Sequence, residues 1–230
     1  MSLTPKDANT IINATNPIYF SHKMTPLPDT TALNTNVKPY VLQEVKPLSF
    51  IFEINGALTP EICGEIISRF EAHPDQQYQG RVGQQASQDQ SVKRSTDLAA
   101  SANEGWQDID QILHRSLGLA IREFQQIQPF FRGPFKDIGY NIQRYQPGEY
   151  YHWHIDGGSH QFADRQLVAI WYLNDIHGPG GETEFLAQEV KIKPQTGKLV
   201  LFPPFWTHEH RAVTVENETK YIATTWVVFS

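Results

Sequence analysis

The sequence contains one cysteine, two methionines and no apolar stretch of membrane-spanning length. Because Cys63 has no second cysteine to pair with, an intramolecular disulfide is excluded, which fits a reducing compartment. No segment approaches the ~20 apolar residues of a transmembrane helix, and the first residues lack the long apolar segment of a secretory signal. These absences together predict a cytoplasmic protein.

An excess of basic residues is also lacking. Lysine and arginine number 19 against 25 aspartates and glutamates, so the formal net charge is −6 and the pI is about 5.8. This balance provides no general electrostatic footprint for nucleic acid or an anionic membrane, although a local basic groove is compatible with it. With 230 residues, of which 40% are hydrophobic and 12% aromatic, the chain can bury one sizeable core. We expect one domain over residues 46–230, preceded by an extended arm over residues 1–45, which are rich in Thr, Asn and Pro.

Two helices are predicted in the first half of the chain. Thr59 is a good N-cap and Pro60 suits the first helical position, so a helix should begin there. A second helix should cover about residues 103–127, where apolar residues keep helical spacing. The polar stretch between them, residues 76–90, is predicted to be a mobile loop. The first helix should bury one apolar face, formed by Cys63, Ile66, Ile67 and Phe70.

From Asp137 onward the pattern changes to short β-branched and aromatic runs separated by turns such as Gln146–Gly148, Gly178–Gly181 and Pro194–Gly197. Such a succession predicts a mainly β (α+β) protein with a two-sheet jelly-roll core. The two helices should brace one sheet from the outside.

The most informative motif is His152-Trp153-His154-Ile155-Asp156, followed far downstream by a second short histidine motif. Residues two apart on a strand project from the same face, so His154 and Asp156 can hold one metal ion together. Either His208 or His210 could complete the set. Two imidazoles and one carboxylate leave about three positions of an octahedral ion open, which is what a non-haem Fe(II) oxygenase needs.

Strand parity predicts a polar interior. If residues 138–146 are extended, Asn141, Gln143 and Tyr145 share one face, which is unexpectedly polar for the inside of a barrel. On the last strand, Lys220 has the same parity as Ile222, Thr224, Trp226 and Val228. A buried lysine needs an anionic partner, because burying an unpaired charge is costly. A dicarboxylate ligand would supply one.

The order of motifs over roughly the last 180 residues resembles the prolyl 4-hydroxylase-like branch of the 2-oxoglutarate and Fe(II)-dependent oxygenases. The segments that carry this resemblance are F-E-I-N-G-A-L-T-P-E-I-C, K-R-S, I-Q-R-Y-Q-P-G-E-Y-Y-H-W-H-I-D, V-A-I-W-Y-L-N, G-G-E-T-E-F, G-K-L-V-L-F-P and H-R-A-V-T-V-E-N-E-T-K-Y-I-A-T-T-W. The resemblance implies a double-stranded β-helix, that is, a jelly-roll core.

Residue by residue, the resemblance implies that His154, Asp156 and His210 are the iron ligands. The family's basic residue lies about ten positions after its distal ligand, which favours His210 over His208 and assigns Lys220 to the distal carboxylate of 2-oxoglutarate. Many relatives carry arginine at that position. The resemblance also assigns residues that line the co-substrate or the pocket wall, namely Tyr145, Tyr172, Thr224, Ile170, Thr183 and Trp226.

The implied reaction is hydroxylation of an aliphatic C–H bond with O2, coupled to decarboxylation of 2-oxoglutarate to succinate and CO2, with ascorbate as a candidate reductant. The favoured substrate is a prolyl residue in a protein or peptide, with Tyr151 and Trp226 as flat walls and residues 76–90 and 157–165 around the mouth. A small-molecule hydroxylase on the same scaffold is the alternative. A zinc-binding or otherwise non-catalytic cupin-like module is a third interpretation.

Overall fold

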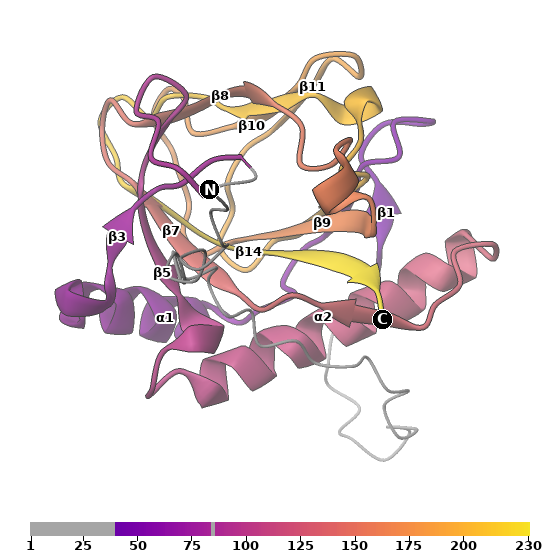
Figure 1. Ribbon diagram of the computed structural model, residues 1–230, viewed down its shortest axis with the longest axis horizontal. Coiled ribbons are helices and arrows are strands. Elements are labelled where there is room, and N and C mark those ends of the chain that lie inside the picture. Colours follow the sequence, from indigo (N-terminus) through magenta and orange to yellow (C-terminus); the bar gives the residue numbers. More distant parts are fainter. Residues whose placement is uncertain (1–39, 84–85) are drawn as a thin grey trace, which may run out of the picture.

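Two antiparallel sheets face each other in the computed structural model, which describes residues 40–83 and 86–230 (Figure 1). Most of the arm predicted from the sequence therefore lies outside the described residues. The mainly β jelly-roll architecture predicted from the sequence is confirmed.

The larger sheet forms the base of the molecule and contains nine strands. Eight of them lie in one continuous order, and β6 (Phe135–Asp137) adds to β14 beside this path. The order is β1 (Gln43–Glu44), β2 (Phe52–Ile54), β12 (Leu199–Phe202), β9 (Arg165–Tyr172), β14 (Lys220–Phe229), β7 (Asn141–Tyr145), β5 (Thr96–Ala99) and β3 (Tyr78–Gln79).

The smaller sheet lies above it and has five strands (Figure 1). Its order is β11 (Val190–Ile192), β10 (Thr183–Phe185), β13 (His210–Ala212), β8 (Tyr150–His154) and β4 (Lys93–Arg94). Each predicted turn connects a strand of the larger sheet with a strand of the smaller one, and glycine adopts positive φ at Gly148, Gly180 and Gly197. At Gly180 and Gly197 a Cβ would also collide with a backbone carbonyl, so only glycine suits these two turns.

Helices α1 (Pro60–Ala72) and α2 (Gln107–Ile127) cover the outer face of the larger sheet (Figure 1). The Thr59 hydroxyl accepts a hydrogen bond from the Ile62 amide, which confirms the predicted cap of α1. Helix α2 begins at Gln107, later than predicted, because a 3-10 turn and the positive φ of Gly105 precede it. Within the described residues, neither helix has the length and apolar character required to cross a bilayer. The 3-10 helices are η1 (Pro74–Gln76), η2 (Ala100–Ala102), η3 (His160–Phe162) and η4 (Trp206–His208).

The alternation of side chains along β9 separates two apolar cores. Leu167, Ala169 and Trp171 belong to the core between the larger sheet and the helices. Val168, Ile170 and Tyr172 belong to the core between the two sheets. Because successive strand residues face opposite sides, both faces of β9 are buried, and one of them faces the interior where the functional side chains gather.

The stretch predicted as a mobile loop, residues 76–90, is partly built into the sheet. Tyr78 and Gln79 form β3 and pair with β5, and Val82 bridges to Ser87 further on. The sequence signal was weak because an edge strand of two residues carries no measurable periodicity.

Candidate active site

Two histidines and one aspartate converge where β8 and β13 lie side by side. His154 ends β8 and His210 begins β13, and the two are direct partners in the antiparallel register. Asp156 follows β8 by two residues, and its amide donates to the carbonyl of Pro204 at 3.1 Å. One ligand atom from each of the three residues lies within 4.8 Å of the others. The structure thus brings together the three residues that the sequence assigned to a metal.

The two imidazoles are held in one orientation by backbone carbonyls. The Nδ1 atom of His154 donates to the carbonyl of His152 at 2.7 Å, and that of His210 donates to the carbonyl of His208 at 2.9 Å. Since a carbonyl only accepts, Nδ1 carries the proton in a neutral ring, and Nε2 is left with its lone pair. This is the tautomer that a divalent metal requires, so the donor set fits Fe(II) chemically.

Burial and mutual charge adjust the ionisation of the cluster. Burial, followed by the nearby His210, lowers the pKa of His154 to about 3. Burial alone would raise the pKa of Asp156, but the neighbouring His210 and the positive charge of Arg165 hold that pKa below its usual range. A neutral imidazole therefore lies beside an ionised carboxylate at neutral pH, as metal binding requires.

His208 and His152 occupy different environments from this cluster. Both ring nitrogens of His208 are engaged, with Nδ1 at 2.8 Å from the Thr207 hydroxyl and Nε2 at 2.9 Å from the carbonyl of Ser49. His152 is exposed and its ring stacks on Tyr150. Neither ring joins the cluster.

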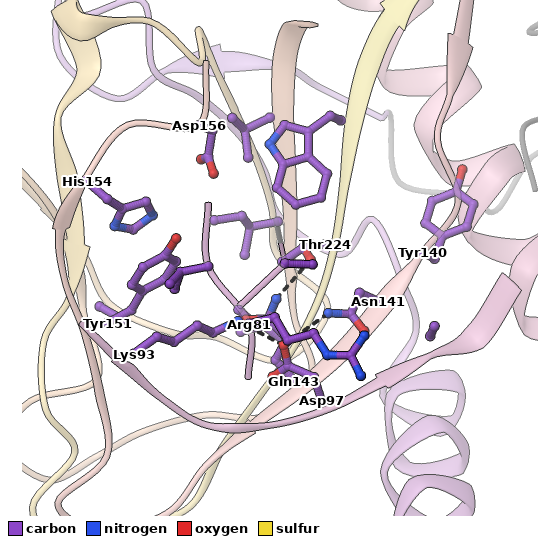
Figure 2. Close-up of a pocket in the computed structure, with 18 of the residues that line it drawn as sticks. Arg81, Lys93, Asp97, Tyr140, Asn141, Gln143, Tyr151, His154, Asp156 and Thr224 are labelled. Atoms are coloured by element: carbon purple, nitrogen blue, oxygen red, sulfur yellow. Dashed lines mark hydrogen bonds and ion pairs between the residues drawn. The ribbon is translucent and has the colours of Figure 1, made fainter. Parts of the chain in front are cut away.

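The cluster lines a cavity of about 300 Å³ between the two sheets. His154 and Asp156 lie toward one end of it, and Asn141 and Tyr140 lie toward the other (Figure 2). The segments predicted to form the mouth contribute to its lining through Arg81–Gly83 and Ala86 on one side and through Gln161, Phe162 and Arg165 on the other. A cavity of this size can accommodate a small ligand.

Lys220 is buried in the wall of this cavity, with 1% of its side chain surface exposed. Its ammonium donates to the carbonyl of Gly181 at 3.0 Å and lies 5.1 Å from the centroid of the Tyr145 ring. Burial lowers the pKa of Lys220 to about 8, an effect that the charge of Glu182 opposes. In the part of the chain that the structure describes, no carboxylate forms an ion pair with this ammonium. The wall thus offers a cation to an anionic ligand.

The other residues assigned from the resemblance line the same cavity as Lys220, except Tyr172. Tyr172 is buried behind the wall, and its hydroxyl donates to Thr183 at 2.6 Å. The indole N–H of Trp226 is buried without a hydrogen-bond partner among the described residues. The residues that line the cavity itself are Tyr145, Ile170, Thr183, Thr224 and Trp226.

Two arginines on neighbouring strands, Arg144 and Arg211, are directed away from the cavity. Arg144 pairs with Glu71 of α1 at 2.8 Å, and Arg211 pairs with Glu184 at 2.6 Å. Neither lines the cavity. Their neighbours on the same strands, Tyr145 and His210, point inward because side chains alternate along a strand.

Sequence reasoning missed a buried ion pair in the cavity wall. The ammonium of Lys93 lies 2.8 Å from the carboxylate of Asp97, and both side chains are nearly inaccessible to solvent. Asp97 also accepts hydrogen bonds from Ser95 at 2.7 Å and from Asn141 at 3.2 Å. In Figure 2, Tyr151 lies between Lys93 and His154, and its ring is stacked on His154 with the centroids 3.5 Å apart. The K-R-S segment is part of the pattern that resembles the family. The sequence does not indicate that its Lys93 pairs with Asp97.

Arg165 was missed as well. Its guanidinium donates to the carbonyl of Asp156 at 2.6 Å and lies between the rings of Phe162 and Trp226, at 3.8 and 4.0 Å from their centroids. These contacts attach the backbone of the Asp156 segment to the cavity wall. No periodicity marks this arginine, because its role depends on a loop that folds back over the strand.

Comparison with known proteins agrees with this geometry. Residues 140–228 match the model of the 2OG-Fe(II) oxygenase superfamily, and this range contains the His154, Asp156 and His210 cluster and Lys220. No curated protein matches the chain at a significant level.

Several solved structures share the fold. A viral collagen prolyl hydroxylase from Paramecium Bursaria Chlorella virus-1, in complex with 2OG, superposes with a TM-score of 0.59 at 20% identity, over 79% of this chain and 96% of the viral one. A prolyl-4-hydroxylase from Pseudomonas putida gives 0.61 at 18% identity, over 79% and 93% of the two chains. A prolyl hydroxylase from Trichoplax adhaerens, in complex with a hypoxia inducible factor peptide fragment, gives 0.67 at 17% identity, over 79% and 84%.

Proposed function

We propose that this chain, a 2-oxoglutarate- and Fe(II)-dependent dioxygenase, hydroxylates a prolyl residue in a protein or peptide. The observation that carries the proposal is the fold shared with solved prolyl hydroxylases, one of which holds a peptide fragment. The balanced reaction consumes one substrate C–H bond, 2-oxoglutarate and O2, and yields the alcohol, succinate and CO2. The bound iron supplies the activation of O2, and the chain supplies binding, orientation and exclusion of water.

The proposed metal ligands are His154, Asp156 and His210. Their support is that one ligand atom from each residue lies within 4.8 Å of the others, and that the Nδ1 hydrogen bonds leave both Nε2 atoms with a lone pair. Lys220 is proposed to bind the distal carboxylate of 2-oxoglutarate, since its ammonium is buried in the same cavity. The co-substrate would also contact the lining formed by Tyr145, Ile170, Thr183, Thr224 and Trp226, with Tyr172 supporting Thr183.

The substrate ring is proposed to lie near Tyr151 and Trp226. Both side chains line the cavity, and aromatic faces pack well against a pyrrolidine ring. An extended chain is proposed to enter between the two groups of lining residues at the mouth, Arg81–Gly83 with Ala86 on one side and Gln161, Phe162 and Arg165 on the other. We also propose a cytoplasmic location, supported by the single and buried cysteine.

A small-molecule substrate is the second candidate, and the Lys93–Asp97 pair favours it. A charged pair in the wall would suit a compact polar metabolite better than an apolar peptide side chain. We also propose that the domain begins at residue 46. Ascorbate is the proposed reductant.

The direct test incubates the protein with Fe(II), 2-oxoglutarate and O2, with and without ascorbate, against proline-containing peptides and a metabolite panel that includes free proline. Mass spectrometry should detect one added oxygen atom on a prolyl residue, together with a matching amount of succinate. The same reaction with the His210→Ala variant is the control. Succinate formation stimulated by a metabolite while every peptide stays unmodified would reject the peptide substrate and favour the second candidate.

A further inference from the structure

Gln143 lies on the inner face of β7, between residues that the proposed function assigns to the co-substrate. Its side chain is 7% exposed and lines the cavity. In the register with β14, Gln143 lies opposite Ile222, Tyr145 lies opposite Lys220, and Asn141 lies opposite Thr224. Gln143 is thus flanked on one side by the Lys220 position and on the other by the Thr224 position.

Both ends of the Gln143 amide make hydrogen bonds to inward-facing hydroxyls. The Tyr145 hydroxyl donates to Oε1 at 2.8 Å. Nε2 donates to the Thr224 hydroxyl at 3.3 Å, a bond drawn in Figure 2. An amide has an acceptor end and a donor end, so this chain of bonds has a direction from Tyr145 to Thr224. Thr224 accepts from Gln143 and therefore keeps its own hydrogen for a further acceptor.

We propose that Gln143 is a positioning residue that directs the Thr224 hydroxyl hydrogen toward an oxygen atom of 2-oxoglutarate. The inference rests on the proposed function, in which Lys220 binds the distal carboxylate. Gln143 does not itself contact the co-substrate. It acts by occupying one lone pair of the Thr224 oxygen, which leaves the hydroxyl to donate into the cavity.

The strand geometry indicates which end of the co-substrate Thr224 serves. Thr224 is four residues after Lys220 on β14, and an extended chain rises by about 3.3 Å per residue, so the two Cα atoms are about 13 Å apart. Because strand side chains stand roughly perpendicular to the sheet, the proposal assigns the two residues to opposite ends of the dicarboxylate. Thr224 therefore serves the end that carries the 1-carboxylate and the 2-oxo group.

Neighbouring polar groups do not replace Gln143 in this arrangement. The Asn141 amide donates to Asp97 at 3.2 Å, and its oxygen accepts from the Tyr78 hydroxyl at 3.1 Å. Both ends of that amide are thus directed away from Thr224. The amide of Gln143 is the group that links Tyr145 to Thr224 in the described structure.

A double-mutant cycle on co-substrate binding tests the inference. The full chain is loaded with Mn(II) without O2, and the dissociation constant of 2-oxoglutarate is measured by calorimetry. The variants are Gln143→Leu, Thr224→Val and the double variant, with Ile222→Val as a control for packing in the same wall. Thr224→Val should weaken binding about tenfold, which is the effect of one hydrogen bond to a charged group.

The expected result is strong non-additivity. Gln143→Leu should weaken 2-oxoglutarate binding, but adding it to Thr224→Val should change the constant by less than about twofold, because Gln143 acts through Thr224. In the active enzyme, KM for 2-oxoglutarate should rise while KM for the other substrate is unchanged. Gln143→Glu preserves the shape and provides a second variant, which should bind more weakly still because its carboxylate takes the Thr224 hydrogen and repels the ligand.

Two results would overturn the inference. Multiplicative effects in the cycle would show that Gln143 and Thr224 act independently, and unchanged binding in both Gln143 variants would show that the amide has no role. If these occur while Lys220→Ala still weakens binding, only the inference fails. If the wild-type protein does not bind 2-oxoglutarate at all, the proposed function fails with it.

Discussion

Lys220 and Tyr145 are direct partners across β14 and β7, and the ammonium lies 5.1 Å from the centroid of the phenol ring. This is a cation–π contact, and such a contact stabilises a cation that has lost much of its hydration. It does not replace a carboxylate, because burial still lowers the pKa of Lys220 to about 8. The buried charge of Lys220 should therefore be stabilised further when an anionic ligand binds beside it.

The affinity for 2-oxoglutarate should fall at alkaline pH. The ligand binds the charged form of Lys220, so affinity is full below the pKa of about 8 in the free protein and is lost as the pH rises through it. Above that value the dissociation constant should rise by about tenfold per pH unit. Calorimetric titrations of the Mn(II)-loaded protein between neutral and alkaline pH measure this directly.

Lys220→Arg is the matched control for this pH dependence. Arginine stays protonated throughout the range, so the alkaline decrease in affinity should disappear. A decrease of equal size in this variant would mean that a different group titrates.

Removing the side chain of Lys220 should weaken 2-oxoglutarate binding by about tenfold to hundredfold, which corresponds to one charge-assisted hydrogen bond. Metal binding should be largely retained, since Lys220 is not part of the metal cluster. Arg144→Ala and Arg211→Ala serve as controls, because both side chains pair with glutamates outside the cavity. Wild-type affinity in Lys220→Ala would assign the carboxylate to another residue.

Replacing His154, Asp156 or His210 by alanine should abolish succinate production. Each variant should also bind Mn(II) at least about a hundredfold more weakly, because loss of a ligand costs more than loss of the groups that orient it. Metal titration and a succinate assay on the same samples separate this effect from misfolding.

His208→Ala should retain the metal site and instead lower stability modestly, since the ring bonds to the carbonyl of Ser49. Tight metal binding in His210→Ala, combined with its loss in His208→Ala, would reverse the assignment of the distal ligand.

Asp97→Ala should lower the free energy of unfolding by about 3–5 kcal/mol, because it leaves the Lys93 ammonium buried without its partner. Urea denaturation measures the change. The double variant Lys93→Met/Asp97→Leu removes both charges and should recover part of the loss. A single variant within about 0.5 kcal/mol of wild type would indicate that Lys93 finds water or another acceptor.

Local rules determined much of this protein before any tertiary contact is considered. Thr59 and Pro60 mark the start of α1 because capping depends on a few consecutive residues. Side chains alternate between the two faces of a strand, which places Asn141, Gln143 and Tyr145 on the face opposite Ile142. The spacing of His154 and Asp156 indicated a metal site in the same way.

Only the tertiary structure decided which distant groups meet. The pairing of β13 with β8 places His210 opposite His154. His208 instead bonds to the carbonyl of Ser49. The Lys93–Asp97 pair and the link from Gln143 to Thr224 likewise depend on contacts between segments and on the inward direction of their side chains. A sequence pattern specifies the face on which a side chain lies, but the partner across the cavity is specified by the register of strands far apart in the chain.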